Sequence, residues 1–339
     1  MKIIILCDTI VKVDSKDKKI LYHLLNNCRQ SFNSIGKKVG LSKDIVAYRV
    51  KRLEKEGVIL NYRTNFKIGT FGLSVARFYY SLQLISPKLK QEIIDYFVQS
   101  KCTQYVFETE GCYDLEVGAF TDLNSSDKYF LAFYDETQRR YRQYFDEQIG
   151  AIFNKIENLG YGILLGEKGV QPPTFASNPK RVVKIDDLDI KIMQMLAENA
   201  RIPTIEIAKE LNITVVTIKN RIKRLINANV ITGFFIRVDW LELGYRGFFV
   251  QINLKDYNMK NKIIDYVKKN PNLVNVIHTI GINNDLDFGF GLNDVTKLHE
   301  IIKDLSAKFP DSIKNFKYYS LLKNHKWIGI PQYDLKFER

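Results

Sequence analysis

The sequence predicts an α+β protein made of two copies of one unit, each a winged helix-turn-helix followed by a ferredoxin-like βαββαβ domain. Three observations predict this class: an internal repeat, a capped three-helix pattern in each copy, and the same order of strands and helices behind each pattern. The chain has 339 residues, enough for about two to four domains of ordinary length.

The repeat aligns Val13 with Ile185 and continues without a gap to Gly72 and Gly244. Sixteen of the sixty aligned positions are identical, which is well above the level that chance gives. The two halves therefore share one backbone path. We expect helix-turn-helix domains at 1–66 and 184–240, ferredoxin-like domains at 67–167 and 241–330, and a proline-containing linker at 168–183.

Three short helices are expected at the start of the first copy. Residues 15–26 carry an apolar stripe with helical spacing. Ser31 is placed to cap a second helix at Phe32–Val39, and Ser42 to cap a third that runs to about Glu56. Val58–Phe66 follows as a strand-like segment.

The second copy keeps this pattern with conservative exchanges. Thr214 replaces the capping serine of the third helix. Gly40 and Gly57, which follow the second and third helices, become Asn212 and Asn229. Glycine and asparagine both tolerate positive φ, so we expect left-handed backbone at all four positions.

The outer face of each third helix is the predicted DNA-binding surface, because a helix-turn-helix places this helix in the major groove. Asn and Arg suit base edges, and Lys suits phosphates. The predicted contacts are Ser42, Lys43, Tyr48, Arg49, Lys51, Arg52, Thr214, Thr217, Asn220, Arg221, Lys223 and Arg224. The net charge of +13 favours a polyanionic partner, double-stranded DNA. A merely solvated helix face is the alternative interpretation.

Both copies resemble the Lrp/AsnC (feast/famine) family of transcriptional regulators. The landmarks in the first copy are Asp17, Ile20-Leu21, Asn27-Cys28-Arg29, Ser42, Val46, Arg49-Val50, Arg52-Leu53 and Gly57-Val58-Ile59. Those in the second are Asp189, Ile192-Met193, Asn199-Ala200-Arg201, Thr214, Ile218, Arg221-Ile222, Arg224-Leu225 and Val230-Ile231. The resemblance implies a cytoplasmic transcriptional regulator whose sheet domains dimerise and bind a small effector such as an amino acid.

The segments behind the helices read as strand, helix, two strands, helix and strand in each half. In the first half we expect strands at Leu73–Leu84, Thr103–Glu110 and Tyr113–Thr121, a second helix at about 124–144 and a last strand that ends near Leu165. The second half repeats the order between Arg246 and residue 323. Their aromatic stretches are expected in sheet cores.

The family has a Gly-x-Tyr-Asp turn between the middle strands, and this turn is the predicted effector site. It appears here as Gly111, Tyr113 and Asp114. The second copy has Gly281 and Asp285 with one extra residue between them and no tyrosine, which puts effector binding in doubt there. Ordinary hairpin chemistry explains the same residues equally well.

The duplication suggests an internal pseudo-dimer, with association of whole chains as the alternative. Because Lys43, Asp44 and Tyr48 of the first third helix differ from their counterparts in the second, we expect an asymmetric operator. The first helix also holds Glu54 and Glu56, so it is expected to contribute less.

Other classes of function receive less support. The four cysteines have no pairing rhythm, the histidines have no ligand-like spacing, and no apolar segment is long enough to span a membrane. We therefore expect no metal, no cofactor, no membrane contact and no catalysis. Two alternatives stay open: an Lrp-like enzyme of the siroheme decarboxylase type, with His278 as its candidate acid, and a metabolite sensor without DNA binding.

Overall fold

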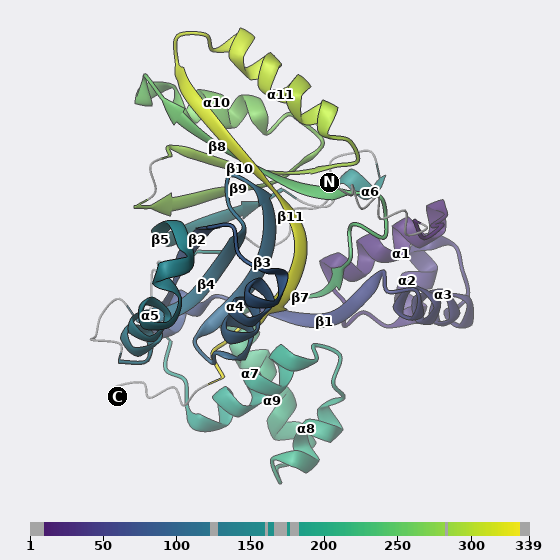
Figure 1. Ribbon diagram of the computed structural model, residues 1–339. Coiled ribbons are helices and arrows are strands. Elements are labelled where there is room, and N and C mark those ends of the chain that lie inside the picture. The colour runs from purple at the N-terminus through teal and green to yellow at the C-terminus, as the bar shows by residue number, and fades with distance from the viewer. Residues whose placement is uncertain are drawn as a thin grey trace.

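The computed structural model describes residues 10–122, 128–159, 162–165, 175–176, 183–281 and 284–332. Its centre is a β-barrel to which both halves of the chain contribute (Figure 1). Two three-helix units stand outside this barrel, and a two-stranded ribbon connects them to it. No helix among the described residues has both the length and the apolar character needed to cross a membrane.

The helix-turn-helix units confirm the predicted elements closely. The first contains α1 (Ser15–Asn26), α2 (Phe32–Val39) and α3 (Lys43–Lys55), followed by β1 (Ile59–Phe66). The second contains α7 (Asp187–Glu198), α8 (Thr204–Glu210) and α9 (Val215–Asn227), followed by β7 (Ile231–Val238). Gly40 and Gly57 have φ of 69° and 77°, and Asn212 and Asn229 have φ of 52° and 58°, as the aligned exchanges predict.

Each half continues into a βαββαβ domain. The first has β2 (Leu73–Leu82), α4 (Pro87–Gln99), β3 (Thr103–Gly111), β4 (Leu115–Asp122), α5 (Lys128–Tyr141) and β5 (Phe145–Asn158). The second has β8 (Arg246–Leu254), α10 (Lys260–Val267), β9 (Leu273–Ile280), β10 (Leu286–Leu292), α11 (Val295–Lys308) and β11 (Ile313–Trp327). Short elements complete the described chain: 3₁₀ turns η1 (Ile68–Phe71), η2 (Arg142–Tyr144) and η3 (Tyr257–Met259), helix α6 (Gly162–Leu165) and strand β6 (Phe175–Ala176).

Two details differ from the expectation. The last strand of the first domain ends at Asn158, not near Leu165, because the chain turns into the short helix α6, whose Leu164 is buried. The second helix of that domain spans Lys128–Tyr141 and its last turn tightens into η2. Most of the predicted linker, 168–183, lies outside the described residues.

The two βαββαβ sheets close into one barrel. The strand orders are β5-β2-β4-β3 and β11-β8-β10-β9, which is the same order in both halves. Each last strand crosses to the other half: β11 pairs antiparallel with β3, and β5 pairs antiparallel with β9. Closure leaves no free edge between the halves. The helices α4, α5, α10 and α11 pack on the outside of the barrel.

The helical units are exchanged between the halves as well. β1 pairs antiparallel with β7 to form the ribbon, and α1 packs on β7 while α7 packs on β1 (Figure 1). Two pairs of backbone hydrogen bonds also join the halves, and the two bonds of each pair link aligned positions of the repeat in opposite directions. They are Cys28 N–H to Phe234 O (2.8 Å) with Ala200 N–H to Tyr62 O (3.1 Å), and Val11 N–H to Glu242 O (2.9 Å) with Val183 N–H to Thr70 O (2.8 Å).

A fully buried polar cluster lies inside the barrel. Arg77 of β2 donates to Glu116 of β4 at 2.7 Å, to Asp287 of β10 at 3.0 Å and to the hydroxyl of Tyr319 at 3.1 Å. Tyr319 in turn donates to Glu116 at 2.9 Å. Phe249 stands at the position that aligns with Arg77, so the cation occurs in one half alone. Burial raises the pKa of Asp287 to about 6, against the lowering effect of Arg77.

The cluster predicts a pH-dependent stability that Asp287→Asn removes. A pKa that is higher in the folded chain contributes stability fully below about pH 4, and this contribution is lost as the pH rises through about 6. Between about pH 4 and pH 7 we therefore expect the wild type to lose up to about 3 kcal/mol of unfolding free energy relative to Asp287→Asn. Urea unfolding at several pH values measures this, and parallel pH curves for the two proteins would contradict it.

Candidate nucleic-acid interface

Both candidate recognition helices begin at a capped residue, as predicted. The Ser42 hydroxyl accepts a hydrogen bond from the Ile45 N–H at 3.3 Å, and the Thr214 hydroxyl accepts one from the Thr217 N–H at 3.1 Å. Thr217 also lies 2.8 Å, hydroxyl to hydroxyl, from Thr214. These bonds satisfy backbone groups that a helix start leaves open. They fix where α3 and α9 begin.

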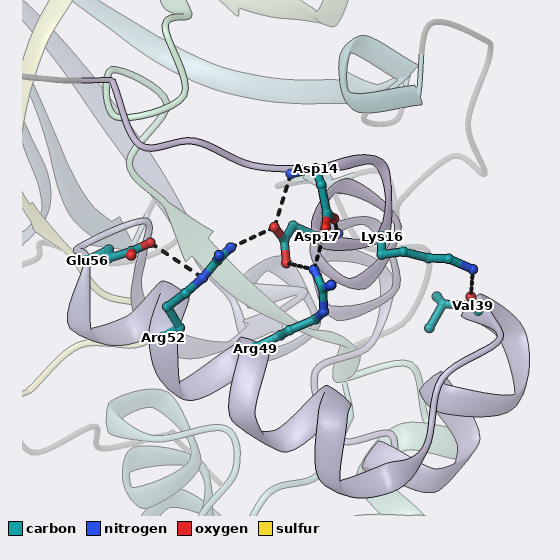
Figure 2. A network of polar contacts seen from close by, with 7 residues as sticks. All are labelled: Asp14, Lys16, Asp17, Val39, Arg49, Arg52 and Glu56. Atoms are coloured by element: carbon teal, nitrogen blue, oxygen red, sulfur yellow. Dashed lines mark hydrogen bonds and ion pairs between the residues drawn. The ribbon is translucent and has the colours of Figure 1, made fainter.

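An ion-pair brace fixes how α3 lies against α1. Arg49 donates to Asp14 at 2.7 Å and to Asp17 at 2.8 Å, and Arg52 donates to Asp17 at 2.6 Å (Figure 2). Asp14 and Asp17 also form a capping box at the start of α1. Asp17 is 1% exposed, so its two arginine partners compensate a buried charge.

The second unit repeats the brace at the aligned positions. Arg221 bonds to Asp186 and, at 3.1 Å, to Asp189, while Arg224 bonds to the other oxygen of Asp189. Burial would raise the pKa of Asp186, but the Arg221 hydrogen bond and neighbouring backbone donors lower it to about 2. The Asp186–Arg221 pair is therefore ionised at neutral pH.

The brace gives four of the predicted DNA contacts a second role. Arg49, Arg52, Arg221 and Arg224 hold α3 and α9 in place, and their side chains are 23%, 32%, 28% and 49% exposed. Sequence reasoning placed these arginines on the DNA-binding face and did not predict their aspartate partners. The signal was present, since two acids and two arginines recur at the same spacing in both copies.

Other predicted contacts stand clear of the protein. On α3, Lys43 and Lys51 are exposed, and Tyr48 is 72% exposed. On α9, Asn220 and Lys223 are exposed at the positions that align with Tyr48 and Lys51. The structure adds exposed residues outside the predicted set: Lys219, Ile45 (46% exposed) and Val216 (67% exposed).

The aspartates of the turns that were predicted to bind an effector bond to the ends of neighbouring strands. The carboxylate of Asp114 accepts the Leu82 N–H of β2 at 2.8 Å, and that of Asp285 accepts the Leu254 N–H of β8 at 2.7 Å. The equivalent bond in both halves gives these aspartates a structural role, and effector binding at the turns stays a prediction. Gly111 and Gly281, at the start of the turns, have φ of 123° and 99°. Tyr113 is buried inside the barrel, where it donates to Gln251 at 3.1 Å.

The brace predicts that Asp189→Asn destabilises the second helical unit. The change removes the charge that Arg221 and Arg224 share, and we expect the unfolding free energy to fall by about 2 kcal/mol. Asp187→Asn is the matched control, because Asp187 is an exposed acid in the same helical turn without an ion pair among the described residues. Denaturant midpoints measure both variants, and equal midpoints would rule the brace out as a source of stability.

Comparisons with known proteins agree with this geometry. The family model described as winged helix-turn-helix DNA-binding matches residues 13–59 and 185–232. An uncharacterized HTH-type transcriptional regulator of Pyrococcus furiosus is 49% identical over 63 residues, which are 19% of this chain and 43% of that protein. The chain spans about two fifths of the length of the first relatives that it matches.

Two further proteins are similar over longer stretches. HTH-type transcriptional regulator LysM of Sulfurisphaera tokodaii is 30% identical over 117 residues, which are 34% of this chain and 81% of LysM. The crystal structure of the siroheme decarboxylase NirDL covers 95% of both chains with a TM-score of 0.60 and 10% identity, which shows a shared fold. Two winged helix-turn-helix units match the family model, and the similarity to LysM extends over most of that protein. The chain therefore belongs to the Lrp/AsnC family of HTH-type transcriptional regulators, as a tandem duplication of the family's unit.

Proposed function

We propose that this chain is a sequence-specific regulator of transcription that binds double-stranded DNA through α3 and α9 in the cytoplasm. The observation that carries the proposal is the exposed face of α9. Four basic residues and no acid lie between Thr214 and Asn229, and three residues of this face, Lys219, Asn220 and Lys223, point away from the core. Amide and lysine side chains on a capped, exposed third helix suit base edges and phosphates.

The braced arginines have a supporting part in this proposal. Because each is bound to an aspartate, its main contribution is to hold the recognition helix, and any phosphate contact is secondary. Exposed apolar side chains complete the surface, since Val216 on α9 and Ile45 on α3 are suited to the methyl groups of thymine. Asp44 in the first turn of α3 weakens phosphate attraction in the first unit.

We propose regulation by binding and not catalysis. The candidate acid His278 lies with its Nε2 3.0 Å from Glu157, and the same carboxylate binds Lys155 and Lys268. Burial lowers the pKa of His278, which favours the neutral ring. This surface ion cluster on β5 and β9 has an evident structural role. The siroheme decarboxylase alternative draws on the shared fold with NirDL alone. Modulation by an amino acid, through the hairpin turns, stays a proposal of lower priority.

The α9 surface predicts a defined loss of DNA affinity in the double variant Lys219→Ala/Lys223→Ala. If each lysine neutralises one phosphate, the slope of log affinity against log salt falls by about 2. Fluorescence anisotropy with a DNA duplex selected on the full chain measures it. The control is Lys262→Ala/Lys303→Ala, which removes the same charge from exposed positions on α10 and α11. Equal slopes for the two double variants would remove α9 from the interface.

Unlike recognition helices predict an operator with two unlike half-sites. Tyr48 and Asn220 occupy aligned positions on α3 and α9, and their side chains recognise different base edges. Selection from a random DNA pool is expected to return an asymmetric sequence. Asn220→Ala is expected to weaken the base preference in one of its two half-sites. A perfect palindrome would contradict this expectation.

A further inference from the structure

A chamber of about 720 Å³ lies between the barrel and the β1–β7 ribbon. Its size falls within the range of about 300–1,000 Å³ that is typical of pockets for drug-sized ligands. Half-buried aromatic residues line it, and four different strands contribute Phe107 (β3), Phe235 (β7), Phe249 (β8) and Trp327 (β11). Phe235 and Trp327 meet edge to face at 5.4 Å, so the ribbon and the barrel touch at one side of the chamber.

The chamber holds a cation with no directly bonded anion among the described residues, although Asp239, which also lines the chamber, attracts it. Arg237 of β7 lines the chamber and makes no hydrogen bond or ion pair with any described residue. Burial is the main reason why the pKa of Arg237 falls to about 10, with a further contribution from Arg63. Its guanidinium is thus charged and poorly hydrated at neutral pH, and an organic anion would relieve this cost. Further cations of the lining are Arg246, the exposed Lys323 and Arg77, which is paired with Glu116.

One glycine adds room at the site. The side-chain oxygens of Asn275 and Asn324, both among the lining residues, are buried without a hydrogen-bond donor among the described residues and have almost no surface open to the chamber, so the ligand need not reach them. Gly247 of β8 lines the chamber, and a Cβ placed there would make ordinary van der Waals contacts with Leu321 and Phe249, at 3.6 and 3.8 Å. Glycine in a strand is typical of close approach by a ligand.

The geometry points to this chamber as a binding site for a flat aromatic molecule that carries a carboxylate or a similar anionic group and is larger than a free amino acid. Its aromatic body packs against Phe107, Phe249 and Trp327, and its anion pairs with Arg237. The site is separate from the hairpin turns at Asp114 and Asp285, and its wall is the ribbon that bears both recognition units.

Occupancy can be read without knowing the natural ligand. Trp240 and Trp327 are the two tryptophans of the chain, and both line the chamber, so energy transfer from tryptophan reports on a bound dye. The probes are anilinonaphthalene sulfonate and its uncharged twin phenylnaphthylamine, which share one aromatic body. For the wild type we expect saturable binding of one sulfonate probe per chain, with tryptophan quenching.

Three variants of the full chain test the assignment. Arg237→Gln is expected to lower the affinity for the sulfonate probe about tenfold, because one charge-assisted bond is lost, and to leave the affinity for the uncharged probe unchanged. Gly247→Leu fills part of the chamber and is expected to lower the affinity for both probes. Arg139→Gln, an exposed arginine of α5, is the control and is expected to change neither. Unfolding midpoints confirm that each variant is folded; should Gly247→Leu fail to fold, Gly247→Ala supplies a smaller loss of the same kind.

Equal sulfonate affinity in the wild type and Arg237→Gln, or in the wild type and the folded Gly247 variant, would overturn the proposal. Regulation through the chamber rests on the proposed function, and it predicts that the sulfonate probe changes DNA affinity in the wild type and not in Arg237→Gln. A chain that binds the probe but no DNA would refute the proposed function and leave the chamber standing. A chain that binds DNA but no probe would do the reverse.

Discussion

The reciprocal exchange of strands between the two halves is the constraint on which the rest of the structure depends. β5 and β11 each complete the sheet of the other half, and β1 and β7 pair across the same pseudo-twofold axis. A βαββαβ sheet alone would expose one face and both edges, which are costly in water. Closing the barrel buries these faces, and so the position of each helical unit is set by strands from both halves.

Many of the helices and turns could be predicted because the repeat shows each local sequence pattern twice, once in each copy. The caps at Ser42 and Thr214 and the left-handed positions at Asn212 and Asn229 follow from local chemistry, which one sequence is enough to reveal. The closed barrel is a matter of long-range pairing. Nothing in the alternation of β5 or β11 says which strand they join, and only the duplication suggested an internal pseudo-dimer.

The roles of charged residues were the harder part. Arg49 and Arg221 were interpreted as part of a basic, DNA-binding helix face. Sequence spacing shows which residues share one face of a helix, but it does not show which residues of a neighbouring helix pack against that face. Their partners are 32 and 35 positions away, on another helix. The chamber was not predictable either: Arg237 and Trp327 are 90 positions apart, and they line one chamber only because β11 and the ribbon come together in the fold. The α6 turn after Asn158 was missed because Gly162–Leu165 is apolar enough to pass for a strand.

Because the two copies are joined in one polypeptide, the assembly of the barrel does not depend on the concentration of the protein. A regulator assembled from separate subunits falls apart on dilution and can exchange subunits with its paralogues, whereas here the second half of the barrel is always within reach. Joining the copies also frees each of them to change alone. Arg77 is buried in one half, and Phe249 stands at the aligned position where an identical subunit would bring a second arginine. A symmetric assembly could not acquire this arginine without doubling the buried charge.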